Sequence, residues 1–178
     1  AVDGLKNETK GTNPPKRHTE KSLLRVMETC GKKFKQGDES DEEFDSEMIK
    51  FMHNKGKVAL DVQGFLRTVG ENKEMVFKDW KEKKEYLPYI DYLKTDAAEA
   101  EIMTGTKDRK MAAEMLFNWG AKEIMITYNK EVLIYNGEKY YTCPLKPRNL
   151  SGRTGRGDTC FSAYITERLN KDIEDALL

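Results

Sequence analysis

Apolar positions from residue 44 onward follow two patterns that alternate along the chain. A helical spacing over 44–52, ended by Gly56, is followed by a run over 57–62 that is typical of a buried strand. Further strands are expected over 90–93 and 123–127, and further helices over 97–103 and 108–119. This alternation predicts an α/β fold in which helices flank a parallel sheet.

The helix expected over 108–119 has the clearest apolar face. Met111, Met115 and Trp119 recur on one side of it, and Gly120 stops it. Ala112 and Leu116 lie beside this face, and such an apolar surface is typical of a helix that packs on a core.

The last third of the chain predicts a hairpin followed by helices. Asn136-Gly137, between two short apolar runs, is a dipeptide that favours a tight turn. The remaining expected elements are strands over 74–77, 132–135 and 139–143, and helices over 80–86, over 159–169 and from 172 onward.

The first 43 residues have a different character. Residues 1–20 combine glycine, proline and charges without periodicity, which indicates a loop or a poorly ordered segment. A helical stripe follows over 21–34, and a charge-rich connection over 35–43. We therefore expect a segment 1–43 made of loop plus helix, or of fragments, and an α/β part over 44–178.

Composition narrows the function classes. The 178 residues carry 31 basic and 31 acidic side chains, and zero net charge argues against a nucleic-acid or anionic-membrane partner. No apolar run is long enough to span a membrane, and residues 1–20 do not resemble a signal peptide. Three cysteines without Cys-x-x-Cys spacing argue against disulfides and zinc, and favour a cytoplasmic protein.

The segment Gly155-Arg156-Gly157-Asp158 carries the strongest chemical signal. Its glycines allow a loop whose N–H groups, with the start of the following helix, bind an anion. Asp158 would then be a carboxylate beside that anion, as phosphoryl transfer to an alcohol requires. The same pattern also suits a turn that ends in an aspartate N-cap, and the segment alone leaves both interpretations open.

Polar groups also follow three of the expected strands. They belong to the segments 61–67, 94–105 and 126–131. In parallel sheets, ligands bind beyond the carboxyl ends of the strands. Together with Gly155–Asp158 these segments predict one ligand site.

The order of these motifs resembles the ribokinase family, also called the PfkB carbohydrate kinases, over roughly 44–178. Gly155-Arg156-Gly157-Asp158 is similar to the family's Gly-Ala-Gly-Asp signature, although Arg156 replaces alanine. Asp96-Ala97-Ala98-Glu99 resembles its Asn-x-x-Glu motif, with aspartate for asparagine. The segment from Asp61 to Arg67 resembles the family's Asp-x-x-x-x-x-Arg segment, and its sequence is more similar to the sugar-alcohol and unassigned branches than to ribokinase itself. Thr127 and Asn129 fall where the family has Thr-x-Gly.

The resemblance implies an ATP-dependent kinase of a sugar, sugar alcohol or nucleoside. Asp158 would be the general base, and the amides of Gly155, Arg156 and Gly157 the anion hole. The motif of Asp96 and Glu99 would hold Mg²⁺, mainly through water. Thr127 and Asn129 would line the nucleotide, and Arg67 would contact phosphate or substrate. The expected partner is a small-molecule substrate, with no nucleic acid or membrane, and a homodimer stays open.

The resemblance also implies an incomplete chain. Family members are longer and begin with strands that include a paired-glycine substrate motif, for which residues 1–43 offer no counterpart. One alternative is therefore a truncated nucleotide-binding or regulatory protein without turnover. A dinucleotide-binding oxidoreductase is the other, but no Gly-x-Gly-x-x-Gly follows a first strand.

Overall fold

The computed structural model describes residues 46–69, 74–129, 131–145 and 155–177. The helix expected over 21–34, with the rest of the segment 1–43, lies outside these residues and stays a prediction. None of the described helices is long and apolar enough to cross a membrane.

Helices and strands follow the expected order along the described residues, with an additional short helix over 63–66 and an additional strand over 67–69. The helices are α2 (Glu47–His53), α3 (Gln63–Leu66), α4 (Lys83–Tyr86), the 3-10 helix η1 (Leu87–Tyr89), α5 (Ala97–Thr104), α6 (Arg109–Asn118), α7 (Arg156–Arg168) and α8 (Ile173–Ala176). The strands are β1 (Ala59–Asp61), β2 (Arg67–Val69), β3 (Met75–Phe77), β4 (Tyr92–Asp96), β5 (Glu123–Thr127), β6 (Glu131–Tyr135) and β7 (Tyr140–Pro144).

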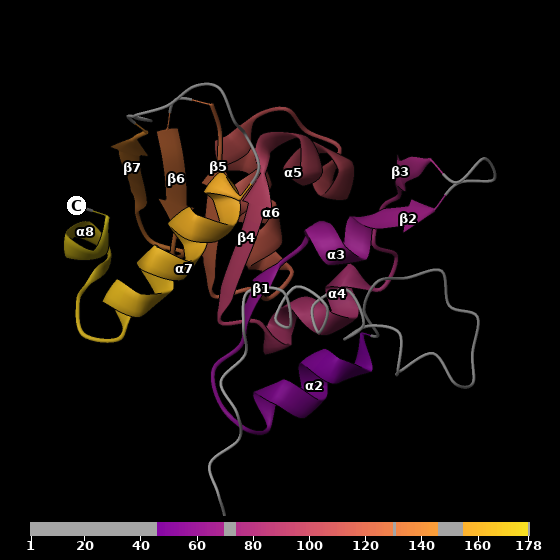
Figure 1. Ribbon diagram of the computed structural model, residues 1–178, viewed down its shortest axis with the longest axis horizontal. Helices are drawn as coiled ribbons and strands as arrows, with labels where there is room; N and C mark the ends of the chain where they lie inside the picture. The colour runs from indigo at the N-terminus through magenta and orange to yellow at the C-terminus, as the bar shows by residue number, and fades with distance from the viewer. Residues whose placement is uncertain (1–45, 70–73, 130, 146–154, 178) are drawn as a thin grey trace, which may run out of the picture. The chain divides into compact units, whose positions relative to one another are not determined.

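Five strands form one sheet in the order β1-β4-β5-β6-β7 (Figure 1). β1, β4 and β5 run parallel, whereas β6 and β7 are antiparallel to their neighbours. The predicted α/β sheet with a C-terminal hairpin is therefore confirmed. β2 and β3 form a separate antiparallel ribbon; the apolar pattern predicted β3 but missed β2, which has only three residues.

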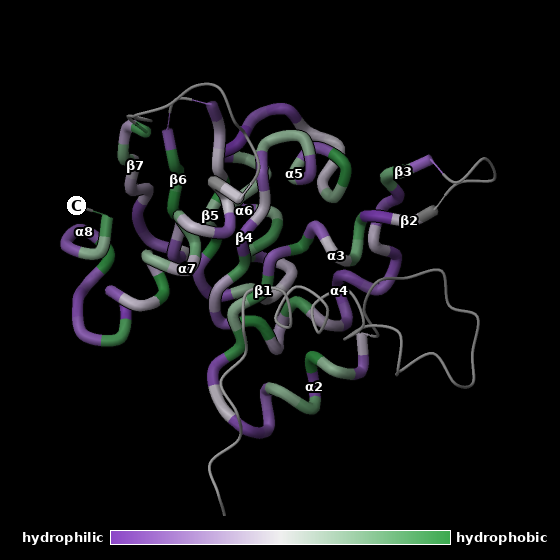
Figure 2. The backbone as a smooth tube through the Cα atoms, viewed as in Figure 1, coloured by the Kyte–Doolittle hydropathy of each residue, from purple (hydrophilic) through white to green (hydrophobic). Residues whose placement is uncertain are grey.

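Helices cover both faces of the sheet. On one face, buried strand residues such as Leu93 and Ile126 belong to the same core as Ala112 and Leu116 of α6. On the other face, Met125 and other buried strand residues pack against α7 and α8. Figure 1 shows α7 crossing in front of the strands with α5 and α6 behind, and Figure 2 shows hydrophobic residues along the central strands.

The hairpin turn forms as its sequence predicts. The Asn136 side-chain oxygen accepts the N–H groups of Glu138 and Lys139 at 3.1 and 2.9 Å, and Gly137 has φ 92°. A Cβ on Gly137 would lie 2.1 Å from the Phe117 ring of α6. Glycine is needed here for both backbone conformation and space.

The buried face of α6 lies to one side of Met111. Met111 is 52 % exposed, whereas Ala112, Ala113 and Leu116 are buried. Two apolar stripes lie side by side on this helix, and the alanine stripe allows a closer approach to the sheet. The predicted helix is therefore present, and the residues beside its methionine face are the ones that are buried.

Two element boundaries also differ. β4 runs three residues beyond the expected strand, to Asp96, because Lys94 and Thr95 are buried strand residues despite their polarity. α7 begins at Arg156 rather than 159, so Gly157 and Asp158 lie inside its first turn. Glycine weakens a helix, which is why propensity placed the start too late.

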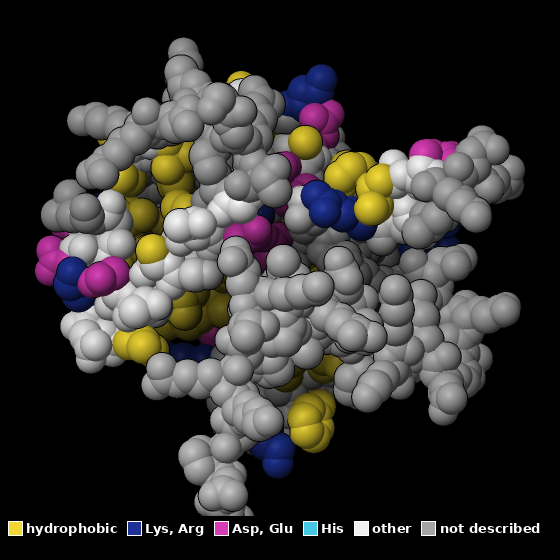
Figure 3. All heavy atoms as spheres, in the orientation of Figure 1, with side chains coloured by type: hydrophobic (Ala, Val, Ile, Leu, Met, Phe, Trp, Pro, Cys, Tyr) yellow, Lys and Arg dark blue, Asp and Glu magenta, His cyan; other side chains and the backbone are white. Residues whose placement is uncertain are grey.

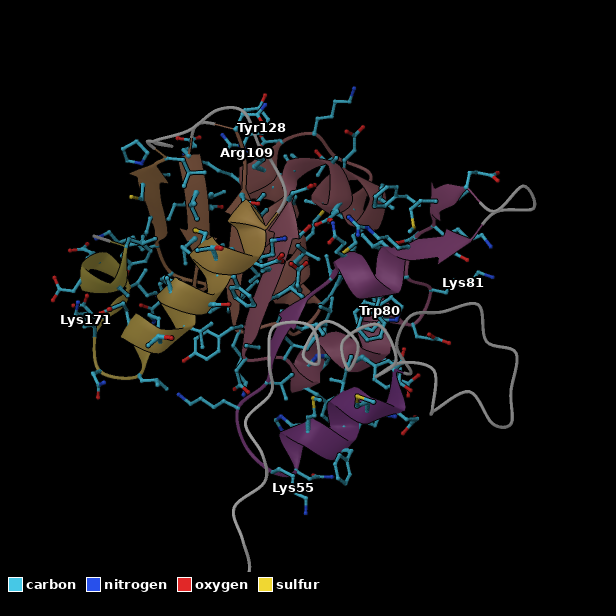
Figure 4. The ribbon with its side chains drawn as sticks, viewed as in Figure 1. Lys55, Trp80, Lys81, Arg109, Tyr128 and Lys171 are labelled. Atoms are coloured by element: carbon cyan, nitrogen blue, oxygen red, sulfur yellow. The ribbon has the colours of Figure 1, made fainter. Side chains whose placement is uncertain are left out.

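Trp80 anchors the region between α2, α3 and α4 (Figure 4). It stacks on Phe65 at 4.6 Å and on Tyr86 at 6.1 Å between ring centroids. Its indole N–H donates to Ser46 Oγ at 3.2 Å. This aromatic cluster holds α3, and with it the start of β2, beside the sheet.

Candidate active site

The carboxyl ends of the three parallel strands meet at one edge of the sheet. Asp61 is in register with Lys94, and Asp96 is in register with Thr127. Thr127 Oγ1 donates to the carbonyl oxygen of Thr95 at 3.4 Å, which ties the ends of β4 and β5 together. The motifs that follow these strands in the sequence are therefore gathered at this edge.

α7 begins at the same edge. Gly155 is its N-cap residue, with φ 78°, and it supplies no side chain to cap the first turn. The N–H groups of a first turn have no partner inside the helix, and the helix dipole favours an anion there. Asp158 lies in this turn with its carboxylate exposed to solvent. Among the described residues no side chain caps this turn, which thus combines backbone donors with one accessible carboxylate.

Asp96 and Glu99 form a capping box at the start of α5. Asp96 Oδ1 accepts the N–H of Glu99 at 2.8 Å, and Glu99 Oε2 accepts the N–H of Asp96 at 2.8 Å. Glu99 is buried, and burial raises the pKa of its carboxyl above the ordinary 4.5. The pair therefore has a structural role whatever else it binds.

The donor atoms at this edge suit a weakly chelated cation. In the capping box, Asp96 Oδ2 and Glu99 Oε1 receive no hydrogen bond from the residues that the structure describes. Within the same described ranges, no group of three His, Cys, Asp or Glu side chains could enclose a metal ion. These residues fit an ion that keeps several waters, as Mg²⁺ usually does.

Arg67 lies at the junction of α3 and β2. Its guanidinium carbon is 5.8 Å from the centroid of the Phe77 ring on the neighbouring strand β3. Arg67 Nε is buried, and no described residue accepts its hydrogen bond. The β2–β3 ribbon therefore holds an arginine with an unused donor.

At the end of β5, Thr127 is half-buried and Asn129 is exposed. The sequence analysis missed Arg109 here, whose guanidinium carbon is 5.0 Å from the centroid of the Tyr128 ring between those two residues (Figure 4). Arg109 Nη2 donates to Glu131, and Arg109 Nη1 is buried without a partner among the described residues. No motif signals Arg109, because its partner is 22 residues away along the chain.

Lys94 is the second residue that the sequence analysis did not assign. Its side chain is only 6 % exposed, and its ammonium donates to Asp61 Oδ2 at 2.6 Å. A Cβ built on Gly157 would lie 3.0 Å from Lys94 Nζ. The lysine therefore reaches from β4 to the first turn of α7. A lysine inside a buried strand would have been the signal for this residue, but the strand was expected to end at residue 93, before Lys94.

The exposed face of this edge is acidic. Figure 3 shows acidic side chains at the centre of the visible face, between α7 and the β2–β3 ribbon. Hydrophobic and basic side chains lie beside them toward the ribbon.

Sequence and structure comparisons define the class of protein. Residues 37–178 match the model of the pfkB family carbohydrate kinases. The chain therefore belongs to the pfkB family of carbohydrate kinases, and its fold is the ribokinase-like α/β fold.

Individual relatives agree with this assignment. Cytidine kinase from Thermococcus kodakarensis is 33 % identical over 85 residues, which cover 46 % of this chain and 31 % of the relative. A pyrophosphate-dependent kinase of the ribokinase family, solved with a pyrophosphate analogue and myo-inositol, is 36 % identical with a TM-score of 0.71. That match covers 76 % of this chain and 50 % of the other.

More distant structures share the fold. Arabidopsis thaliana ribokinase, solved with ribose and ATP, is 22 % identical with a TM-score of 0.60, over 74 % of this chain and 41 % of that one. The chain spans about half the length, or less, of these solved relatives.

Proposed function

We propose that this protein transfers a phosphoryl group from a phosphate donor to a hydroxyl group of a small polyhydroxylated molecule. The acceptor class is a sugar, a sugar alcohol or a nucleoside, and residues 44–178 form the phosphate-handling part of the enzyme. Family membership supports the reaction class, and the named relatives act on cytidine or were solved with myo-inositol or ribose.

One observation carries the proposal: Asp158 is an exposed carboxylate in the first turn of a 13-residue helix that no described side chain caps, where the parallel strands end. In this position it accepts the proton of the attacking hydroxyl as the oxygen bonds to phosphorus. The exposed carboxylate leaves room for an acceptor, while the buried carboxylate of Glu99 does not.

The first turn of α7 stabilises the charge on the transferred group. The backbone N–H groups of Gly155, Arg156 and Gly157 donate to its oxygens, aided by the helix dipole. Fixed backbone donors need no reorganisation during the reaction, which is the main advantage of such a site.

Asp96 and Glu99 would hold Mg²⁺ by accepting hydrogen bonds from its waters. The ion would neutralise charge on the donor phosphates. Asp96 Oδ2 and Glu99 Oε1 are the oxygens available for this role, since their counterparts cap α5. Arg67 would contact phosphate or substrate through the donor that no described residue uses.

The donor side is expected at the end of β5. Thr127 and Asn129 would line a nucleotide, with ATP as the expected donor. Pyrophosphate is a second candidate, because the relative at 36 % identity is a pyrophosphate-dependent kinase. Arg109 contacts Tyr128 at this strand end, and no described residue accepts a hydrogen bond from its buried Nη1. Arg109 is therefore a candidate to bind the phosphates of either ATP or pyrophosphate.

The test combines an acceptor panel with a substitution. Full-length protein is assayed with ATP or pyrophosphate against cytidine, ribose and myo-inositol, and Asp158→Asn is assayed with the best pair. We expect turnover to fall about 10²–10⁴-fold, as for loss of a general base, with donor affinity nearly unchanged.

Asp172→Asn is the matched control for this substitution. Asp172 caps α8 by accepting the N–H of Asp175 at 2.9 Å, and asparagine caps equally well. Its turnover should equal that of the wild type. Turnover of Asp158→Asn within tenfold of wild type would remove Asp158 from the reaction.

A nucleotide-binding or regulatory protein without turnover is the remaining alternative. Donor binding with no product from any acceptor of the panel would favour it. For the kinase we expect a cytoplasmic location, since its donor and acceptor classes are cytoplasmic metabolites.

A further inference from the structure

Lys94 stands at a position where an apolar residue is expected. It lies on the face of the sheet covered by α7, and its register neighbour on β5 is the buried Met125. Burying an ammonium group is costly unless it is paired or has a function. The ammonium of Lys94 pairs with Asp61 at 2.6 Å. This ion pair does not explain why a lysine lies at this buried position of the strand.

The lysine accounts for the glycine at position 157. Gly157 lies inside α7, and it is not among the glycines with positive φ. Its backbone therefore does not require glycine, and alanine would suit a helix better. A Cβ there would lie 3.0 Å from Lys94 Nζ and 3.2 Å from Lys94 Cε. The missing side chain is the space into which the ammonium extends.

The electrostatics of this contact favour an anion. A cation beside the N-terminus of a helix is unfavourable, because both are positive. Asp61 gives the ammonium one acceptor oxygen, because its other oxygen, Oδ1, accepts the N–H of Gln63 at 3.1 Å. An ammonium has three donors, and among the described residues Lys94 has Asp61 as its one hydrogen-bond acceptor. Two donors therefore remain beside the uncapped turn.

We propose that Lys94 binds the phosphoryl group at the first turn of α7, and that Asp61 is the positioning residue that holds its ammonium there. The proposal rests on the proposed function, because it adds a residue to the same site. The side-chain charge supplements the backbone donors, and the compact ammonium fits beneath Gly157 where a guanidinium would not. Asp61 balances the charge when no anion is bound.

The competing interpretation is a purely structural ion pair that fastens β4 to β1. It predicts that Lys94 and Asp61 variants behave alike, because either one breaks the pair. The phosphate-binding role predicts opposite effects on anion affinity. Loss of Lys94 removes an attraction, whereas Asp61→Asn removes a repulsion and keeps a side-chain oxygen that accepts a hydrogen bond from the ammonium.

The experiment measures binding of pyrophosphate alone to full-length protein by calorimetry. Lys94→Met should weaken binding at least tenfold and lower its dependence on salt. Asp61→Asn should leave affinity unchanged or raise it a fewfold. Lys94→Gln, which keeps a donor for Asp61 but no charge, should repeat the loss and guards against a folding defect in the methionine variant.

Lys122→Met is the matched control. Lys122 pairs with Asp91 at 2.7 Å, just before β5 and β4 begin, at the opposite edge of the sheet. Its removal should not change pyrophosphate affinity, and thermal unfolding confirms that each variant is folded.

Two results would overturn the proposal: affinity within twofold of wild type in folded Lys94→Gln, or an equal loss in Asp61→Asn. Neither depends on turnover, so this failure is distinct from failure of the kinase assignment. If no acceptor is phosphorylated while Lys94→Met still loses pyrophosphate, the anion site stands and the kinase proposal falls.

Discussion

The two ends of α7 are each anchored by a charge that the sheet supplies, but they differ in how completely that charge is paired. At the C-terminal end, Arg168 Nη2 donates to Glu123 Oε2 at 2.9 Å and its Nε donates to Glu123 Oε1 at 3.2 Å. Tyr164 donates to the same carboxylate at 2.5 Å. At the N-terminal end, Lys94 has Asp61 alone among the described residues.

The helix dipole separates these ends further. Arg168 is a cation in the last turn, where the dipole favours it, while Lys94 is a cation beside the first turn, where it does not. Burial and the hydrogen bond to Glu123 raise the pKa of Tyr164 above its ordinary 10.0, which keeps the hydroxyl a donor. A fully paired charge serves stability, and a charge with unused donors in an unfavourable field indicates a binding site.

Removing Glu123, which pairs with Arg168 and Tyr164 at the C-terminal end of α7, should give the largest effect on stability. Glu123→Ala leaves Arg168 and Tyr164 without their acceptor, so the free energy of unfolding should fall by about 3–5 kcal/mol, as for a broken buried ion pair. Urea unfolding of the full-length protein measures it. Pyrophosphate affinity of the folded fraction should not change.

Glu167→Ala is the control for that prediction. Its carboxylate pairs with Lys171 on the exposed side of the same helix, and each partner is nearly half exposed. Its effect on stability should be far smaller than that of Glu123→Ala. Equal losses of unfolding free energy in the two variants would mean that the Glu123 cluster stabilises the protein no more than an exposed ion pair does.

Placing a side chain against Lys94 at the N-terminal end of α7 should have a smaller effect, and this effect should be on anion binding alone. Gly157→Ala places a methyl group 3.0 Å from Lys94 Nζ, so the ammonium must move. Pyrophosphate affinity should fall about fivefold, roughly 1 kcal/mol, because part of a charged hydrogen bond is lost. Stability should hold or rise slightly, since alanine is the better helix former.

Gly56→Ala is the control here, because a Cβ at that glycine meets no atom within 4 Å and its φ is not positive. Calorimetry with pyrophosphate compares the two variants. Unchanged affinity in Gly157→Ala would show that the contact with Lys94 does not matter for the anion.

The smallest expected effect is a pH dependence at Glu99. The folded protein holds the Glu99 proton more tightly than the unfolded chain, because burial raises the carboxyl pKa above 4.5. This contribution to stability is present below pH 4.5 and is lost as the pH rises through the raised folded pKa. The unfolding free energy of wild type relative to Glu99→Gln should therefore fall as the pH rises from 4.5 to 7.

Urea titrations of both proteins across that range measure the difference, and a rise instead of a fall would contradict the burial argument. The same variant tests the metal role. If Glu99 orients the waters of Mg²⁺, Glu99→Gln needs a higher magnesium concentration for activity.

The apolar pattern predicted the sheet and the edge where the motifs gather, because strand and helix periods are local properties of the sequence. It did not predict Lys94 as a strand residue, since a lysine is buried only when distant groups such as Asp61 pair with it. Arg109 was missed for the same reason, because it pairs with Glu131 only in the folded chain.

The conformation of the motif at Gly155–Asp158 differs from the expectation. Two glycines indicated a loop, whereas the structure continues the helix through Gly157. The space that the second glycine provides becomes apparent only when α7 lies on β4. A contact between elements more than 60 positions apart leaves no periodic trace in the sequence.

The capping box of α5 also bears on which substitutions position 96 tolerates. Asparagine and aspartate are equally good N-caps, so the exchange between them leaves the start of the helix intact. The aspartate that distinguishes this chain from the Asn-x-x-Glu pattern is therefore a change of one charge without a change of architecture. The side chain at position 96 can therefore be neutral or negatively charged while the backbone around it stays the same.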